Sequence, residues 1–169
     1  MKLKEETKKE GMPQELYNLF IKLIQAECDK LSFIMGAKAY CWTHGLQNDF
    51  EFFHEMYSQC TVFKATLVWH LLTMFEEVPE FKTEAIKTDY DSEEALFVEF
   101  AKREDEFVSI LEETVITAKN TDSVDSLAFL LPIVKNIDHI ACRALEAVRN
   151  DKNPKDLLCN SYCAYNTTC

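Results

Sequence analysis

The 169-residue sequence contains little glycine and little proline, with 3 and 4 residues respectively. Because these two residues interrupt helices most readily, their scarcity leaves few points at which a long helix must end. No segment sustains the alternation of apolar and polar residues that a half-buried strand requires. The sequence therefore predicts an all-α protein, and a hydrophobic content of 47% is enough for one sizeable core.

Other absences bear on location and partners. The first ten residues, MKLKEETKKE, lack the hydrophobic segment of a secretory signal. The longest apolar run, near 66–75, is too short to cross a bilayer. A formal net charge of −11 disfavours nucleic acid and anionic membranes, and no Gly-rich phosphate loop is present. We expect a soluble cytoplasmic protein that binds neither nucleic acid nor membrane.

The seven cysteines fall into two groups. Four lie within helical patterns and read as small apolar residues in a reducing compartment: Cys28, Cys41, Cys60 and Cys142. Three cluster in a polar C-terminal segment: Cys159, Cys163 and Cys169. The spacing of this second group matches no compact zinc motif, so we interpret these residues as exposed thiols, with tethering or redox sensing as a minor alternative.

The chain divides into a charged extension (1–12), a helical domain (13–150) and a cysteine-bearing tail (151–169). Amphipathic periodicity predicts four long helices in the domain, at 13–44, 47–75, 92–120 and 123–150. Pro132 falls inside the fourth of these helices and predicts a kink there.

The lengths of the connections predict the topology. Helices one and two, and helices three and four, are joined by only a few residues and must form antiparallel hairpins. The connector 76–90 can extend to roughly 50 Å, which exceeds the roughly 40 Å length of the helices. Helices two and three can therefore be parallel, which gives an up-down-down-up four-helix bundle with one long crossover.

Two glutamates stand where apolar residues are expected. Glu27 interrupts the helical row Phe20, Leu23, Leu31, Ile34, and Glu104 interrupts the row Phe97, Phe100, Phe107, Leu111. An isolated buried carboxylate is costly unless it meets a cation, a proton or a hydrogen-bond donor. We therefore predict that Glu27 and Glu104 are metal ligands. The alternative is a structural role, in which Lys64 pairs with one of them or the two share a proton.

Several stretches in the same order resemble the ferritin family over residues 13–150. LIQAECDKLSFIMGAKAYCW resembles the first ferritin helix, FEFFHEMYSQC the second, EEALFVEFAKREDEF the third, and LAFLLPIVKNIDHIACRALEAV the fourth. The resemblance implies a ferritin-like fold, a homo-oligomeric cage of about 24 subunits, and iron as the bound metal. It also implies that Glu27 and Glu104 correspond to metal-binding glutamates.

The sequence departs from the ferritin pattern on two helices. The family's Glu-x-x-His pair on the second helix corresponds to Cys60 and Phe63, and the fourth-helix Gln or Glu corresponds to Ile137. Since iron prefers carboxylate and imidazole ligands, the conventional ferroxidase centre is incomplete, and no catalytic residue is assigned. Cys60, Asp138 and His139 are weaker candidates for metal ligands.

Two functions follow from the resemblance. The first is a divergent ferritin that binds and stores iron in an oligomeric cage, with weak or unconventional oxidation of ferrous iron. The alternative is a catalytically inactive ferritin-like subunit that is structural or assembles with an active subunit. The loss of ligands on two helices is the sequence feature that separates these hypotheses.

Overall fold

The computed structural model of the chain describes residues 13–75 and 78–160. These residues form five α-helices and one 3-10 helix: α1 (Gln14–Thr43), α2 (Gln47–Phe75), α3 (Glu93–Asn120), α4 (Val124–Lys135), α5 (Ile140–Arg149) and η1 (Pro154–Asn160). No strand occurs among them, so the predicted all-α class is confirmed. None of these helices is both long enough and apolar enough to cross a membrane.

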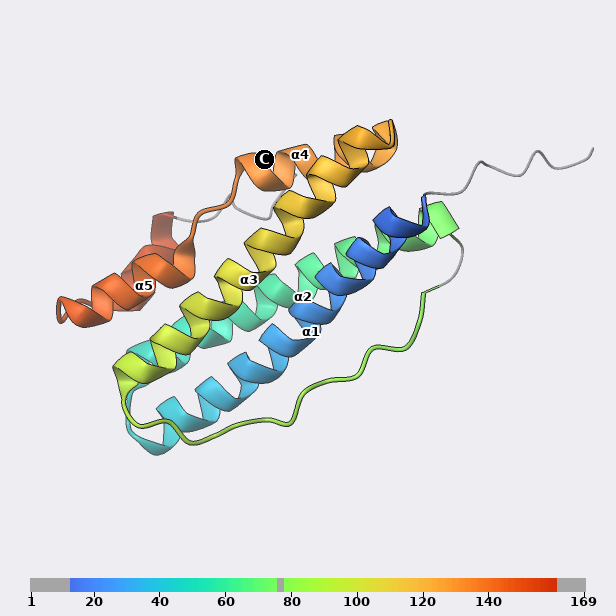
Figure 1. The fold of residues 1–169 in the computed structure, drawn as a ribbon. Coiled ribbons are helices and arrows are strands. Elements are labelled where there is room, and N and C mark those ends of the chain that lie inside the picture. Colours follow the sequence, from blue (N-terminus) through green and yellow to red (C-terminus); the bar gives the residue numbers. More distant parts are fainter. Residues whose placement is uncertain (1–12, 76–77, 161–169) are drawn as a thin grey trace, which may run out of the picture.

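Helices α1 and α2 form an antiparallel hairpin (Figure 1). The turn between them contains Gly45, whose φ of 71° lies in the left-handed region that glycine adopts without strain. At the opposite end, the rings of Tyr17 and Phe75 have centroids 4.5 Å apart, which places the start of α1 beside the end of α2.

The segment that follows α2 returns along the outside of α1 to the turn end of the bundle (Figure 1). Gln25 Nε2 donates a hydrogen bond of 2.6 Å to the carbonyl oxygen of Lys82. A Cβ atom on Gly36 would lie 1.8 Å from the carbonyl oxygen of Lys87, so this close approach requires glycine. Helix α3 then starts beside the second half of α1, where it is capped by Ser92, whose Oγ accepts from Ala95 N–H at 3.0 Å. It consequently runs parallel to α2.

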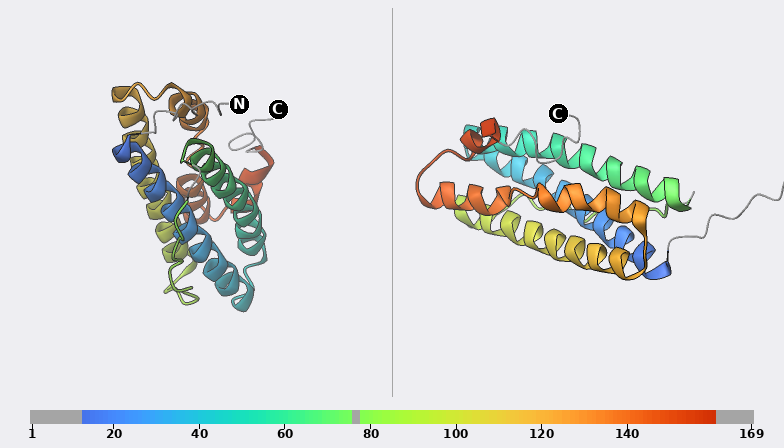
Figure 2. Two further views of the ribbon diagram at one scale, coloured as in Figure 1. Left: turned by 90° about the vertical axis from the view of Figure 1, so that its right-hand side faces the viewer. Right: turned by 90° about the horizontal axis from the view of Figure 1, so that it is seen from above.

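The predicted continuous fourth helix is wrong in one respect, because residues 136–139 divide it into α4 and α5 (Figure 2). Pro132 lies inside α4, and the helix ends one turn after it rather than at it. His139, with a φ of 46°, forms the N-cap of α5. The pair α4 and α5 still occupies the position of one rod, and the ion pair between Arg149 and Glu94, at 2.6 Å, shows that α5 runs antiparallel to α3.

Helix η1 covers the side of the bundle where α2 and α5 face each other (Figure 2). An ion pair between Lys155 and Glu51 joins it to α2. Part of the segment 151–169, interpreted from the sequence as a tail, is therefore packed against the bundle. Cys163 and Cys169 lie outside the described residues.

The apolar core consists of two clusters arranged along the bundle. The turn half lies near the α1–α2 turn and includes Phe33, Phe52, Phe53, Phe97 and Phe100. The entry half lies near the start of α1 and includes Phe20, Leu23, Phe63, Phe107 and Leu111. Along α1, α2 and α3 the two halves meet at the level of Glu27, Cys60 and Glu104, which is where the candidate site lies.

Candidate functional site

Three charged side chains are buried between the two halves of the core, and we call them the polar layer: Glu27, Lys30 and Glu104. Their exposed fractions are 0%, 4% and 6% respectively. Charged groups are rarely this deeply buried unless they compensate one another. The structure thus brings the two predicted glutamates into one interior, together with a lysine that the sequence analysis did not single out.

The ammonium group of Lys30 forms an ion pair with Oε1 of Glu27, which lies one turn earlier on α1. The same ammonium lies 4.6 Å from the centroid of the Phe107 ring, where a cation is attracted to the π face. Burial raises the pKa of Glu27 and of Glu104, and the positive charge of Lys30 opposes the rise at both carboxyls. Lys30 therefore supplies the positive charge that the sequence analysis expected from a metal.

Glu104 obtains a hydrogen-bond donor because the chain is interrupted between α4 and α5. Its Oε2 accepts from the backbone N–H of Ala141 at 3.1 Å. Ala141 is in the first turn of α5, where backbone N–H groups have no partner within the helix and the helix dipole favours a negative charge. A continuous helix would have directed this N–H to the carbonyl of Ile137 instead. The helix break thus stabilises the buried carboxylate.

Glu27 has a different environment. The ammonium group of Lys30 and the thiol of Cys60 lie within hydrogen-bonding reach of its carboxylate, and its compensation comes chiefly from the charge of Lys30. The thiol of Cys60 lies beside it, and burial raises the pKa of that thiol to about 12. At neutral pH Cys60 is therefore a neutral thiol rather than the thiolate that would bind metal.

The remaining predicted positions add no hard ligand to the layer. Phe63 packs against Phe107 with ring centroids 5.6 Å apart, and Ile137 contacts the entry half of the core. Asp138 forms an ion pair with Arg143. His139 lies near enough to Glu104 for its positive form to lower the pKa of that carboxyl. Within the residues described, no three His, Cys, Asp or Glu side chains form a group that could hold a metal ion.

The donor set does not fit a conventional diiron centre. Such a centre surrounds each iron with carboxylates and imidazoles, whereas the polar layer offers two carboxylates and an ammonium group, with the neutral thiol of Cys60 beside it. A ferrous ion could enter between the carboxylates only after Lys30 had moved or lost its proton, because like charges repel strongly in an interior of low dielectric constant.

The sequence itself contains a signal that Lys30 is buried. Leu23, Glu27, Lys30 and Ile34 follow one another at helical spacings of four, three and four, so Lys30 belongs to the same buried row. The cation considered instead was Lys64, whose charge lowers the pKa of Glu27 less than that of Lys30 does.

Comparison with known proteins adds no family assignment: the sequence matches no family model, and no curated protein matches it. Any inference about function therefore depends on the residues and the geometry of this chain.

Replacement of Lys30 tests the compensation within the polar layer. Lys30→Met leaves two buried carboxylates without their cation, and we expect it to lower the free energy of unfolding by about 3–5 kcal/mol at pH 7. The double variant Glu27→Leu with Lys30→Met removes both members of the pair and should recover most of this loss. Urea denaturation measures both effects, and Lys22→Met, on an exposed position of the same helix, is the control.

The raised pKa of Glu104 predicts a pH dependence of stability. The ordinary value is 4.5 and the folded value is higher, so the folded state holds this proton more tightly. The resulting stabilisation is complete below pH 4.5 and is lost as pH rises through the folded pKa. Glu104→Gln cannot ionise, so its stability relative to wild type should rise with pH in this window, by up to about 1.4 kcal/mol per pH unit.

Denaturation curves at a series of pH values measure this slope. Glu112→Gln removes an exposed carboxylate from the same helix and serves as the control. A difference between Glu104→Gln and wild type that stays constant with pH would show that Glu104 does not change its protonation state on folding.

Proposed function

We propose that this chain is a ferritin-like subunit with a structural role in an iron-storing assembly, and that it does not itself oxidise ferrous iron. The ion pair between Lys30 and Glu27 is the observation that carries the proposal. It lies where the ferritin resemblance expects the metal centre, and it provides there the positive charge that a metal would otherwise provide. Iron is cargo of the assembly in this proposal rather than a ligand of the polar layer.

The arrangement of helices supports the ferritin-like part of the proposal. Two long antiparallel hairpins and a long connector along the outside of α1 are what an up-down-down-up bundle with one crossover requires. The family's second-helix ligands would have to come from Cys60 and Phe63, and these positions hold a neutral thiol and a core aromatic ring. This supports a loss of oxidation within a retained bundle.

The outward surface of α2 supports assembly. Its exposed residues between 58 and 73 are all uncharged, and we call them the uncharged face: Ser58, Thr61, Val62, Ala65, Thr66, Trp69, Leu72 and Thr73. Val62 and Trp69 are 58% and 69% exposed. In a chain with a net charge of −11, copies approach each other with least repulsion at such a face, and a two-fold pairing would bury the face against itself.

The proposal places the protein in the cytoplasm. Four cysteines whose side chains the structure describes are free thiols: Cys28, Cys41, Cys60 and Cys142. Free thiols persist in a reducing compartment, and three of these four are buried, where they act as apolar side chains.

Light scattering after size exclusion, together with aerobic addition of ferrous iron, tests the functional proposal. We expect a large oligomer in which the rate of ferric absorbance growth does not exceed that of buffer, because the polar layer lacks ligands for paired irons. Iron counted per chain, with and without an active ferritin subunit mixed in, measures storage. Faster oxidation by this chain alone would favour the competing function, a ferritin with an unconventional oxidation site.

Substitution on the uncharged face tests assembly. Trp69→Glu places a charge at the most exposed large side chain of this face, and we expect the assembly to dissociate into smaller species with unchanged helical content. Ile116→Glu, at a position of α3 that is 59% exposed, makes the same change elsewhere and should leave the mass unaltered. Equal loss of mass in both variants would show that α2 has no special role in association.

A further inference from the structure

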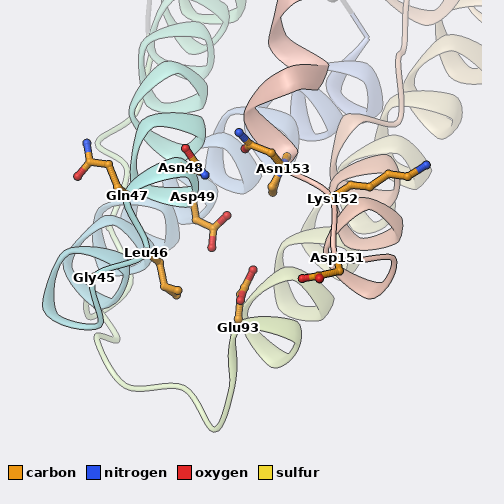
Figure 3. A pocket seen from close by; sticks show the side chains of 10 residues that line it. Gly45, Leu46, Gln47, Asn48, Asp49, Glu93, Asp151, Lys152 and Asn153 are labelled. Carbon is orange, nitrogen blue, oxygen red and sulfur yellow. The ribbon is translucent and has the colours of Figure 1, made fainter.

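A cavity of about 400 Å³ lies at the end of the bundle that holds the α1–α2 turn (Figure 3). It is bounded by the first turn of α2, the start of α3 and the segment 151–154 that follows α5. The polar layer is not part of it. The cavity is therefore formed by three segments that lie far apart in the sequence.

Asp49 is the most unusual residue of this cavity. It is only 4% exposed, and its carboxylate points into the cavity towards that of Glu93 (Figure 3). Its hydrogen-bond partner among the described residues is the carboxyl group of Glu93, and two carboxyl groups can bond to each other only when one of them carries a proton. A buried carboxylate that faces a second carboxylate needs either a proton or a cation.

The basic side chains around the cavity do not meet this need. The ammonium group of Lys152 points away from the two carboxylates (Figure 3). Arg149 pairs with Glu94, and Lys155 pairs with Glu51. Burial and the charge of Glu93 together raise the pKa of Asp49 to about 7, which reflects this lack of a nearby positive charge.

We propose that the cavity binds one hard divalent cation of the Ca²⁺ class, with Asp49 and Glu93 as its charged ligands. Calcium takes six to eight oxygen ligands from carboxylates, amides, backbone carbonyls and water, in flexible geometry. Asn48 and Asn153 line the same cavity, and Asp151 brings a third carboxylate to its rim. Oδ1 of Asn153 accepts a hydrogen bond of 2.9 Å from the backbone N–H of Lys155, so it has one lone pair left for an ion. Because the described acids do not form a ready group of three, water completes the coordination and the affinity is modest.

Calorimetric titration of the full chain with CaCl2 at pH 7.5 tests this site. We expect about one ion per chain with a Kd on the order of 0.1–1 mM, the range of weakly charged calcium sites. Thermal unfolding followed by circular dichroism should show a rise in Tm of roughly 2–4 °C in 5 mM CaCl2. MgCl2 should give a smaller rise, because Mg²⁺ loses its hydration water reluctantly.

Asp49→Asn is the decisive variant. It should weaken calcium binding at least about tenfold, since one of the two charged ligands is lost. In the absence of calcium its Tm should exceed that of wild type, because the repulsion between buried carboxylates is removed. Glu112→Gln, which removes an exposed carboxylate far from the cavity, should bind calcium as wild type does.

Two results would overturn the proposal. Equal responses to calcium in wild type and Asp49→Asn would indicate diffuse binding to an acidic surface. A higher Tm in Asp49→Asn without any response of wild type to calcium would indicate that the two carboxylates only share a proton. Should Asp49→Asn fail to fold, Glu93→Gln, at a partly exposed position, provides the same comparison.

Discussion

The ion pair between Lys30 and Glu27 is the constraint on which the interior depends. Both groups are removed from water at the level where the turn half and the entry half of the core meet. Desolvation of each charge costs several kcal/mol, so neither group is tolerable without the other. A buried pair of this kind adds little net stability compared with apolar residues. It does impose a register, because sliding α1 along its neighbours would move both charges into an apolar cluster.

The interruption between α4 and α5 meets a related need, because Glu104 is a second buried carboxylate that requires a partner. Glu104 lies too deep to be solvated, and an uninterrupted helix beside it would offer no free N–H at mid-length. The interruption at 136–139 sacrifices some helical hydrogen bonds and directs the N–H of Ala141 at the carboxylate. A hydrogen bond to a charged acceptor is stronger than the neutral bond it replaces.

Much of this arrangement could be predicted from local patterns. Periodicity located the helices to within a few residues, and the positions of Glu27 and Glu104 in apolar rows predicted that both are buried. Lys30 was harder to recognise, because lysines on helices usually extend to solvent along an apolar stem. Pro132 predicted a kink in the fourth helix, but the position of the break at 136–139 and the cavity could not be predicted. Ala141 carries no sequence signal for a bond to Glu104, and an aspartate in the first turn of a helix, like Asp49, is ordinarily solvated.

A helical bundle in which a lysine compensates the buried carboxylates differs from one in which a bound metal ion compensates them. In a vacant metal centre, carboxylates repel one another and the fold is completed by the ion, so stability and loading are linked. Here the ammonium group of Lys30 and a backbone N–H at the start of α5 act as partners of the two carboxylates from within the chain itself. Internal partners for both carboxylates agree with the proposal that this chain has a structural rather than a catalytic role in an assembly. In the proposed function the polar layer maintains the shape of the bundle, and the uncharged face of α2 is the surface proposed for association with other subunits.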